Sequence, residues 1–221
     1  MNRFYAGMLS ISILIAASGC SRVLNFNQDK CISTAPVVTQ QRPASAVTNI
    51  IAANGFNISY SQSPKPRISV SAPSDLMDMV HTDIKGETLS IYSTKSLGAC
   101  DINIVVESPS VSDFTISSGT QFTIQGAYSS TSDVTVNISS GAMFIAPSSF
   151  SAPKIALGSS SGSQIKLDAI SSSAISAAAS SGSSVYLAGT SREAHLSVSS
   201  GAGISAGKLD ATSGSASASS G

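Results

Sequence analysis

The dipeptide Ser-Gly recurs six times in the second half of the chain at nearly constant spacing. A period near 20 residues, repeated this often, is the signature of a solenoid in which each repeat forms one coil. Such a chain can bury a core only by stacking neighbouring coils. The glycines are Gly119, Gly141, Gly162, Gly182, Gly201 and Gly221, separated by 22, 21, 20, 19 and 20 residues.

Apolar residues occupy fixed positions five residues before, three after and five after these glycines, and polar residues, mostly Ser and Thr, separate them. Alternation with a period of two predicts half-buried strands, and the runs of Ser disfavour a helix. We therefore expect an all-β, parallel β-helix-like solenoid with coils of about 20 residues. The apolar residues are Phe114, Val136, Leu157, Ala177, Leu196 and Ala216; Phe122, Phe144, Ile165, Val185 and Ile204; and Ile124, Ala146, Leu167, Leu187 and Ala206.

The repeated glycines are expected at corners between the strands of a coil. A corner needs a positive φ or a bulge, and Gly adopts either without a steric penalty. The Ser before each glycine can hydrogen-bond to nearby backbone, and stacked corners would align their hydroxyl groups. The corner glycines are Gly119, Gly141, Gly162, Gly182 and Gly201.

Alternation continues upstream with a looser period, so residues 45–112 are expected to form an N-terminal β region before the solenoid of residues 113–221. Turns are expected at 63–66 and 85–87, and one helical turn within 75–80. Residues 20–44 have little periodicity and are interpreted as a tether. The four predicted strands are Asn57–Tyr60, Arg67–Val70, Thr88–Ile91 and Asn103–Val106.

The first residues are typical of an export signal. An apolar stretch of about fourteen residues is too short to span a membrane and fits a signal peptide over residues 1–19. It ends in Ala17-Ser18-Gly19-Cys20, which resembles a bacterial lipobox. Acyl chains such as palmitate on Cys20 would anchor the protein to a membrane, and Ser21 favours the outer membrane, on its periplasmic or its external side. The alternative is an ordinary secretory cleavage site beside an incidental cysteine.

Two cysteines remain after Cys20. In an exported protein, Cys31 and Cys100 are expected to form a disulfide that ties the N-terminal segment to the strand region beginning at Asp101. The alternative is a pair of unpaired, buried thiols.

Charge and composition exclude several classes of function. Only 11% of the residues are charged, and twelve basic residues balance twelve acidic ones, so the basic surface of a nucleic-acid-binding protein is missing. Two His and three Cys are too few for a multi-His or multi-Cys metal centre, and no motif for a cofactor is present. No metal or cofactor is therefore expected.

Catalysis is the weaker of two functional hypotheses. Polysaccharide lyases and hydrolases also use β-helices, and a glycosidase needs two carboxylates at a defined separation. The acidic residues of the repeats lie at unequal offsets from the glycines, so we interpret them as solvated charges and assign no catalytic residue. They are Asp113, Asp133, Asp168, Glu193 and Asp210. His195 precedes an inward Leu and should point outward.

The favoured hypothesis is a non-catalytic lipoprotein of the cell envelope with a structural or adhesive role. A hydroxyl-rich, uncharged β face could bind a glycan or a protein. The last coil would leave a strand edge open, from which we expect self-association into a homo-oligomer.

Three segments and the coils after them resemble a known family. They are Asn54-Gly55-Phe56-Asn57-Ile58, Lys85-Gly86-Glu87-Thr88-Leu89-Ser90-Ile91, and Val105-Val106-Glu107-Ser108-Pro109 leading into Ile116-Ser117-Ser118-Gly119. Their order resembles the "putative autotransporter adhesin, head GIN domain" family of Bacteroidetes lipoproteins of unknown function, over residues 45–221 as one domain. The resemblance implies a right-handed parallel β-helix-like fold preceded by paired strands, and no established enzyme activity. The last coil departs from the family because it is rich in small residues and lacks an evident cap.

Overall fold

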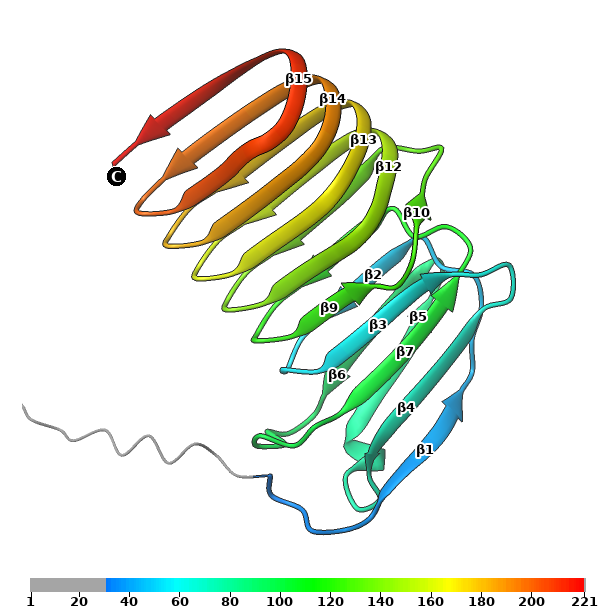
Figure 1. The fold of residues 1–221 in the computed structure, drawn as a ribbon. Coiled ribbons are helices and arrows are strands. Elements are labelled where there is room, and N and C mark those ends of the chain that lie inside the picture. The colour runs from blue at the N-terminus through cyan, green and yellow to red at the C-terminus, as the bar shows by residue number, and fades with distance from the viewer. Residues whose placement is uncertain (1–30, 221) are drawn as a thin grey trace, which may run out of the picture.

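The computed structural model describes residues 31–220, which form one 15-stranded sheet wound around a single core (Figure 1). One 3₁₀ helix, η1 (Met77–Met79), interrupts the strands. The strands are β1 (Val37–Arg42), β2 (Asn49–Ala52), β3 (Asn57–Gln62), β4 (Arg67–Pro73), β5 (Val80–Lys85), β6 (Thr88–Ser93), β7 (Asn103–Ser108), β8 (Asp113–Ile116), β9 (Gln121–Ile124), β10 (Tyr128–Ser129), β11 (Val134–Ile138), β12 (Met143–Ser159), β13 (Gln164–Ala179), β14 (Ser184–Ser199) and β15 (Gly203–Ser219).

The sheet forms two long walls, and each coil adds a strand segment to both. The first wall runs β1, β4, β7, β3, β9 and then the first segments of β12 to β15. The second wall runs β5, β6, β2, β8, β11 and then the last segments of β12 to β15. Each long strand thus crosses both walls, with a register shift near the bend between them. The short β10 pairs with the middle of β12 at this bend.

Equal positions of successive coils stack inside the solenoid, as the repeat predicts. Phe122 pairs in register with Phe144, Phe144 with Ile165 and Ile165 with Val185, and all four side chains are fully buried. The expected all-β solenoid with coils of about 20 residues is therefore confirmed. The column ends at Ile204 in β15, which is only half-buried because no described strand covers its other side.

Each Ser-Gly corner is a tight turn in which both central residues have a positive φ. Ser118 has a φ of 54° and Gly119 a φ of 73°, and Thr120 donates its backbone N–H to the Ser117 carbonyl oxygen at 3.2 Å. Positive φ at both central positions is the property of a type I′ turn. A positive φ is uncommon for a residue with a side chain, and the sequence does not predict it for the serines.

The corners are also bonded to one another. Gly119 donates its backbone N–H to the Ser140 carbonyl oxygen in the next coil at 2.9 Å, and the following corners repeat this contact. The buried Ser183 hydroxyl accepts the Ser180 backbone N–H within its own turn at 3.1 Å and donates to the Ser159 carbonyl oxygen of the preceding coil at 2.8 Å. A corner therefore fixes its own coil and joins it to the coils beside it.

Residues 45–112 contribute coils to the same stack. β2 and β3 meet at Asn54-Gly55, where both residues have a φ of 78°, and pair in parallel with β8 and β9 of the next coil. β6 and β7 pair in parallel with the other edges of β2 and β3. The core thus continues without a break across residue 112, and the four strands expected in this region are present.

The N-terminal end of the stack is built from antiparallel strands. β4 pairs with β7, β5 with β6, and β1 with β4. β1 lies within residues 20–44, the segment interpreted as a tether, so the last part of that segment is a strand of the sheet. Its residues are exposed except for Arg42, so no apolar alternation marks it, and its pairing with β4 holds it in place.

Two further features close this end. Cys31 and Cys100 form a disulfide, which joins the start of the described chain to the segment before β7. Arg42 of β1 pairs in register with Ile68 of β4, so the two side chains lie on the same face of the sheet. Its guanidinium Nη2 donates to the carbonyl oxygens of Met77 at 2.9 Å and of Val80 at 3.3 Å. A charged group facing the core is a common way of ending a sheet, because it prevents another strand from adding there.

Candidate functional site

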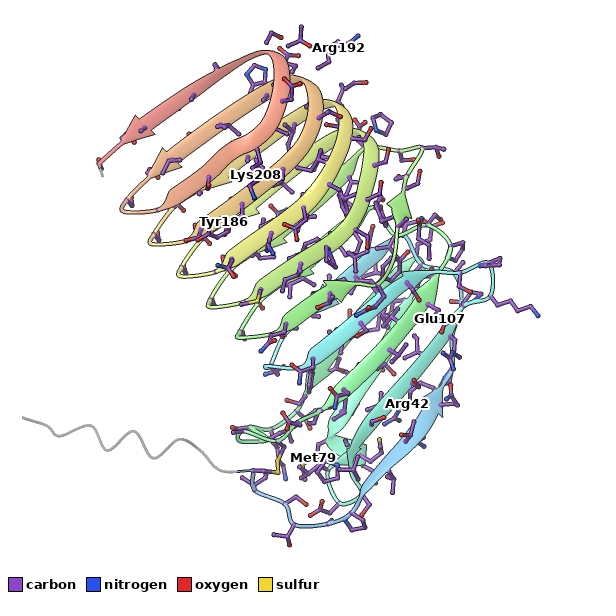
Figure 2. All side chains as sticks on the ribbon, viewed as in Figure 1. Arg42, Met79, Glu107, Tyr186, Arg192 and Lys208 are labelled. Atoms are coloured by element: carbon purple, nitrogen blue, oxygen red, sulfur yellow. A yellow bond between two sulfur atoms is a disulfide. The ribbon has the colours of Figure 1, made fainter. Side chains whose placement is uncertain are left out.

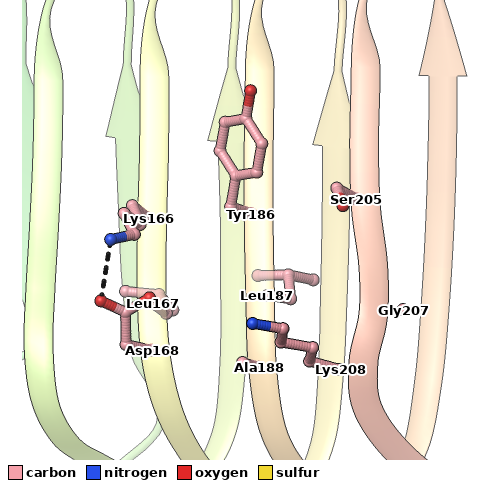
Figure 3. Close-up of a pocket in the computed structure, with 9 residues that line it drawn as sticks. All are labelled: Lys166, Leu167, Asp168, Tyr186, Leu187, Ala188, Ser205, Gly207 and Lys208. Carbon is pink, nitrogen blue, oxygen red and sulfur yellow. Dashed lines mark ion pairs between the residues drawn. The ribbon is translucent and has the colours of Figure 1, made fainter.

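A groove crosses the outer face of the first wall at the last three coils (Figure 3). It encloses about 480 Å³, within the range of sites that hold small ligands. The register shifts of β13 with β14 and of β14 with β15 lie at this point, so the ladder of strand pairing is interrupted beneath it. The lining residues are Lys166, Leu167 and Asp168 of β13, Tyr186, Leu187 and Ala188 of β14, and Ser205, Gly207 and Lys208 of β15.

Strand alternation places the polar side chains of this groove on the outside. Tyr186 lies between the buried Val185 and Leu187, and pairs in register with Lys166 on one side and Ser205 on the other. It is 44% exposed, which makes it a large aromatic ring open to solvent. Figure 2 shows Tyr186 and Lys208 on the same outer surface of the last coils.

Charge in the groove is unevenly paired. The Lys166 ammonium lies 3.1 Å from the Asp168 carboxylate, and both groups are partly exposed. Lys208, the third charged side chain of the lining, forms no ion pair with any described residue. It pairs in register with Ala188, whose small side chain leaves space beside it. The groove therefore carries two ammonium groups and one carboxylate, and Figure 3 shows the Tyr186 ring extending along β14 away from Lys208.

A smaller groove lies on the second wall and encloses about 260 Å³. Its polar lining includes Asp133, Lys154 and His195. The His195 Nε2 lies 2.9 Å from the Glu193 carboxylate and its Nδ1 lies 2.9 Å from the Ser215 hydroxyl, so the imidazole is held by residues of its own and the last coil. As alternation predicts, His195 points outward and is exposed.

The acidic residues of the repeats are distributed over these surfaces rather than gathered. Asp168 is the one carboxylate that lines the larger groove and Asp133 the one that lines the smaller. Within residues 31–220, no group of three or more metal-ligating side chains is close enough to hold an ion. No helix of this described part is long and apolar enough to span a membrane.

The corner glycines and the two described cysteines that the sequence singles out have structural roles in this fold. The corner glycines lie along the edge where the walls meet, and Cys31 and Cys100 lie at the N-terminal end. Cys20 lies outside the described residues. The sequence did not indicate the Tyr186 groove, although alternation between Val185 and Leu187 was sufficient to place the tyrosine outward.

Several solved structures share this fold at low sequence identity. A protein from Parabacteroides distasonis described as a "putative lipid binding protein" is 18% identical, with a TM-score of 0.79 over 84% of this chain and 79% of the other. A "putative adhesin" from Parabacteroides merdae is 15% identical, with a TM-score of 0.79 over 85% and 80%. A second "putative adhesin" from Parabacteroides distasonis is 14% identical, with the same TM-score over 84% and 79%. No curated protein sequence matches this chain.

The sequence itself matches a family model along nearly all of the described solenoid. The match covers residues 46–221, which include every strand from β2 to β15. It includes the Asn54-Gly55 corner as well as the later Ser-Gly corners, so the coils of both halves belong to one homologous unit. The chain therefore belongs to the family described as "putative auto-transporter adhesin, head GIN domain".

Proposed function

We propose that this chain is a non-catalytic, adhesin-like protein of the cell envelope that binds a glycan or protein ligand on the outer face of its solenoid. The observation that carries the proposal is the groove around Tyr186, where an exposed aromatic ring and unevenly paired charges lie on the first wall. Ligand sites commonly combine an apolar surface with a few polar groups in this way. Membership of a family described as adhesin-like supports the same role.

The distribution of carboxylates supports binding over catalysis. A polysaccharide hydrolase requires an acid and a second carboxylate facing each other across the scissile bond. Each of the two grooves described above is lined by a single carboxylate, and the Asp168 carboxylate is already paired with Lys166. The alternative, a polysaccharide-active enzyme, would need its second carboxylate from elsewhere.

Attachment to the outer membrane through acylated Cys20 is the second part of the proposal. The lipobox-like residues before Cys20 support it, as does the disulfide of Cys31 and Cys100, which suits an oxidising compartment. Labelling of growing cells with a palmitate analogue should mark the protein, and Cys20→Ser should abolish the label. Protease treatment of intact cells then distinguishes an external from a periplasmic position, because only an external chain is cleaved.

Binding and turnover can be separated in one experiment. The chain from Cys20 onward is applied to a glycan array and, in parallel, incubated with polysaccharides in a screen for hydrolase and lyase activity. Binding without turnover is the expected result, and Tyr186→Ala should reduce it. Ile51→Ala is the matched control, because Ile51 is 46% exposed on the second wall, away from the groove. Turnover by the unsubstituted chain would overturn the proposal.

A further inference from the structure

The groove at Tyr186 has the dimensions of a site for one or two sugar rings. It extends from β13 across β14 to β15, and two strand spacings of about 4.8 Å give a width of roughly 10 Å. Ala188 and Gly207 provide little or no side chain, so the space between Asp168 and Lys208 stays open. The Lys166–Asp168 pair borders one side and Lys208 the other, as Figure 3 shows.

Tyr186 provides the apolar contact surface. Its phenol ring stands outward from β14 in register with Lys166 and Ser205, and 44% of its surface is exposed. An aromatic side chain with one apolar body and one hydroxyl group suits a ligand that is itself partly apolar and partly hydroxylated. A sugar ring, with a face of C–H groups and a rim of hydroxyls, has that character.

The charges that line the groove favour an anionic ligand. Asp168 neutralises Lys166 at 3.1 Å, whereas Lys208 has no anionic partner among the described residues. A lysine ammonium acts as a point charge toward a carboxylate or sulfate. The net charge of the lining is thus one positive charge, located opposite the paired side of the groove.

We infer that this groove binds acidic glycans, with the sugar ring against Tyr186 and its carboxylate or sulfate at Lys208. The inference rests on the proposed function and specifies its ligand class. The Asp168 carboxylate, kept in place by Lys166, is positioned to accept hydrogen bonds from the hydroxyls of the same sugar. The smaller groove on the second wall lacks an exposed tyrosine in its lining and is not part of this site.

The test compares acidic and neutral ligands of equal length. Calorimetric titration of the chain from Cys20 onward uses a tetragalacturonate, its methyl-esterified form and a sulfated tetrasaccharide as probes. The acidic probes should bind at least about tenfold more tightly than the ester, with an affinity that falls as salt is raised. Preference for carboxylate over sulfate, or the reverse, identifies which acidic group the groove takes.

Variants assign the binding to the groove. Lys208→Ala should weaken binding of the acidic probes about tenfold, the size expected for one charge-assisted hydrogen bond, and Lys208→Arg should largely restore it. Tyr186→Ala should weaken both acidic and esterified probes. Lys154→Ala, in the smaller groove, is the control and should have no effect. Circular dichroism confirms that each variant is folded, which is expected because all of these side chains are exposed.

The inference and the proposed function fail in distinguishable ways. Equal affinity for the acidic and esterified probes, or acidic binding unchanged by Lys208→Ala, overturns the acidic-glycan inference. If neutral glycans bind and Tyr186→Ala removes that binding, the proposed function stands without the inference. If no glycan binds at all, neither on the array nor in the titration, the inference fails, and the proposed function is left to a protein ligand.

Discussion

The rings of Phe122 and Phe144 stack with their planes 2° apart and their centroids separated by 5.5 Å. They occupy the same inward position of successive coils and are both fully buried. The contact is the local form of a general rule in this protein, because each inward side chain packs mainly on its copy in the next coil. Stability in such a stack is expected to depend on contacts between nearest neighbours.

Truncation at this stack should therefore be costly. Phe144→Ala removes a buried ring that also contacts Phe114 and Phe150, and it should lower the free energy of unfolding by about 3–5 kcal/mol. Phe144→Leu retains most of the volume and should cost distinctly less. Urea unfolding followed by circular dichroism measures both. A loss below about 1 kcal/mol for the alanine variant would show that the core relaxes around the cavity.

The corner glycines should matter through backbone conformation rather than space. Gly182 has a φ of 70°, and a Cβ added there would meet no atom within 4 Å. Gly182→Ala should cost about 1–2 kcal/mol from the left-handed conformation alone. Gly203→Ala is the control, because Gly203 lies in open space without a positive φ and should be nearly neutral. Equal melting temperatures for the two variants would show that the positive φ of Gly182 does not determine the cost of the substitution.

At a different glycine, Gly214, a steric contact should disfavour substitution. A Cβ at Gly214 would lie 2.2 Å from the Ala194 carbonyl oxygen of the preceding coil. Gly214→Ala should therefore separate β15 from β14 locally. Amide hydrogen exchange should show faster exchange in the last coil, while protection of the earlier coils stays unchanged because each coil contacts only its neighbours.

Two buried tyrosines should make the protein sensitive to alkali. Burial raises the pKa of Tyr60 to about 12, and burial together with the neighbouring Tyr60 raises the pKa of Tyr128. Their hydroxyls donate to the carbonyl oxygens of Ser108 and Val111. The unfolded chain loses its phenolic protons near pH 10, whereas the folded chain keeps them to a higher pH. The contribution of these two tyrosines to the free energy of unfolding is therefore fully present below pH 10 and is lost as the pH rises above it.

Substitution separates this effect from general alkaline damage. Tyr60→Phe loses one hydrogen bond, which should cost about 1 kcal/mol at pH 8, but the further loss of stability between pH 9 and 11 should become smaller. Tyr186→Phe, at an exposed site, should leave the pH profile of the unfolding midpoint as it is. If the two variants show the same profile, titration of Tyr60 does not drive the alkaline loss.

The disulfide should stabilise the N-terminal end. Cys31 and Cys100 are 69 residues apart, and closing a loop of that length restricts the unfolded chain by about 4 kcal/mol on the entropy model. Replacing both cysteines by serine should lower the free energy of unfolding by about 2–4 kcal/mol. Addition of a reductant should reproduce the loss in the unsubstituted chain and leave the double variant unaffected.

Self-association through the open edge of the last coil stays a prediction. β15 pairs with β14 along one edge, and no described strand pairs with its other edge. Its inward Ile204 and Leu209 are half-exposed, and Lys208 and Asp210 balance in charge, so a second copy would meet no like-charge barrier there. Sedimentation velocity should show a coefficient that rises with concentration and falls again in Ile204→Lys. A monomer at every concentration would contradict the prediction.

The repeat positions were predictable because the physics that fixes them is local. Phe122, Ile165 and Val185 recur at one offset from a glycine, and alternation alone assigns them to the interior. The repeat does not mark the Asn54-Gly55 corner as a member of the series, because β4 to β7 are inserted between it and Gly119. No apolar pattern in the sequence marks β1, because an exposed edge strand needs none.

By itself, the sequence determined the solenoid, its period, the residues inside its repeats and the place of the Ser-Gly corners. These follow from alternation and from the backbone freedom of glycine, which act over a few residues. Only the tertiary structure decided that β2 and β3 enter the same stack and that Lys166, Tyr186 and Lys208 border one groove. These residues come from three coils, and their proximity depends on register and on the shifts between strands, which no single repeat specifies.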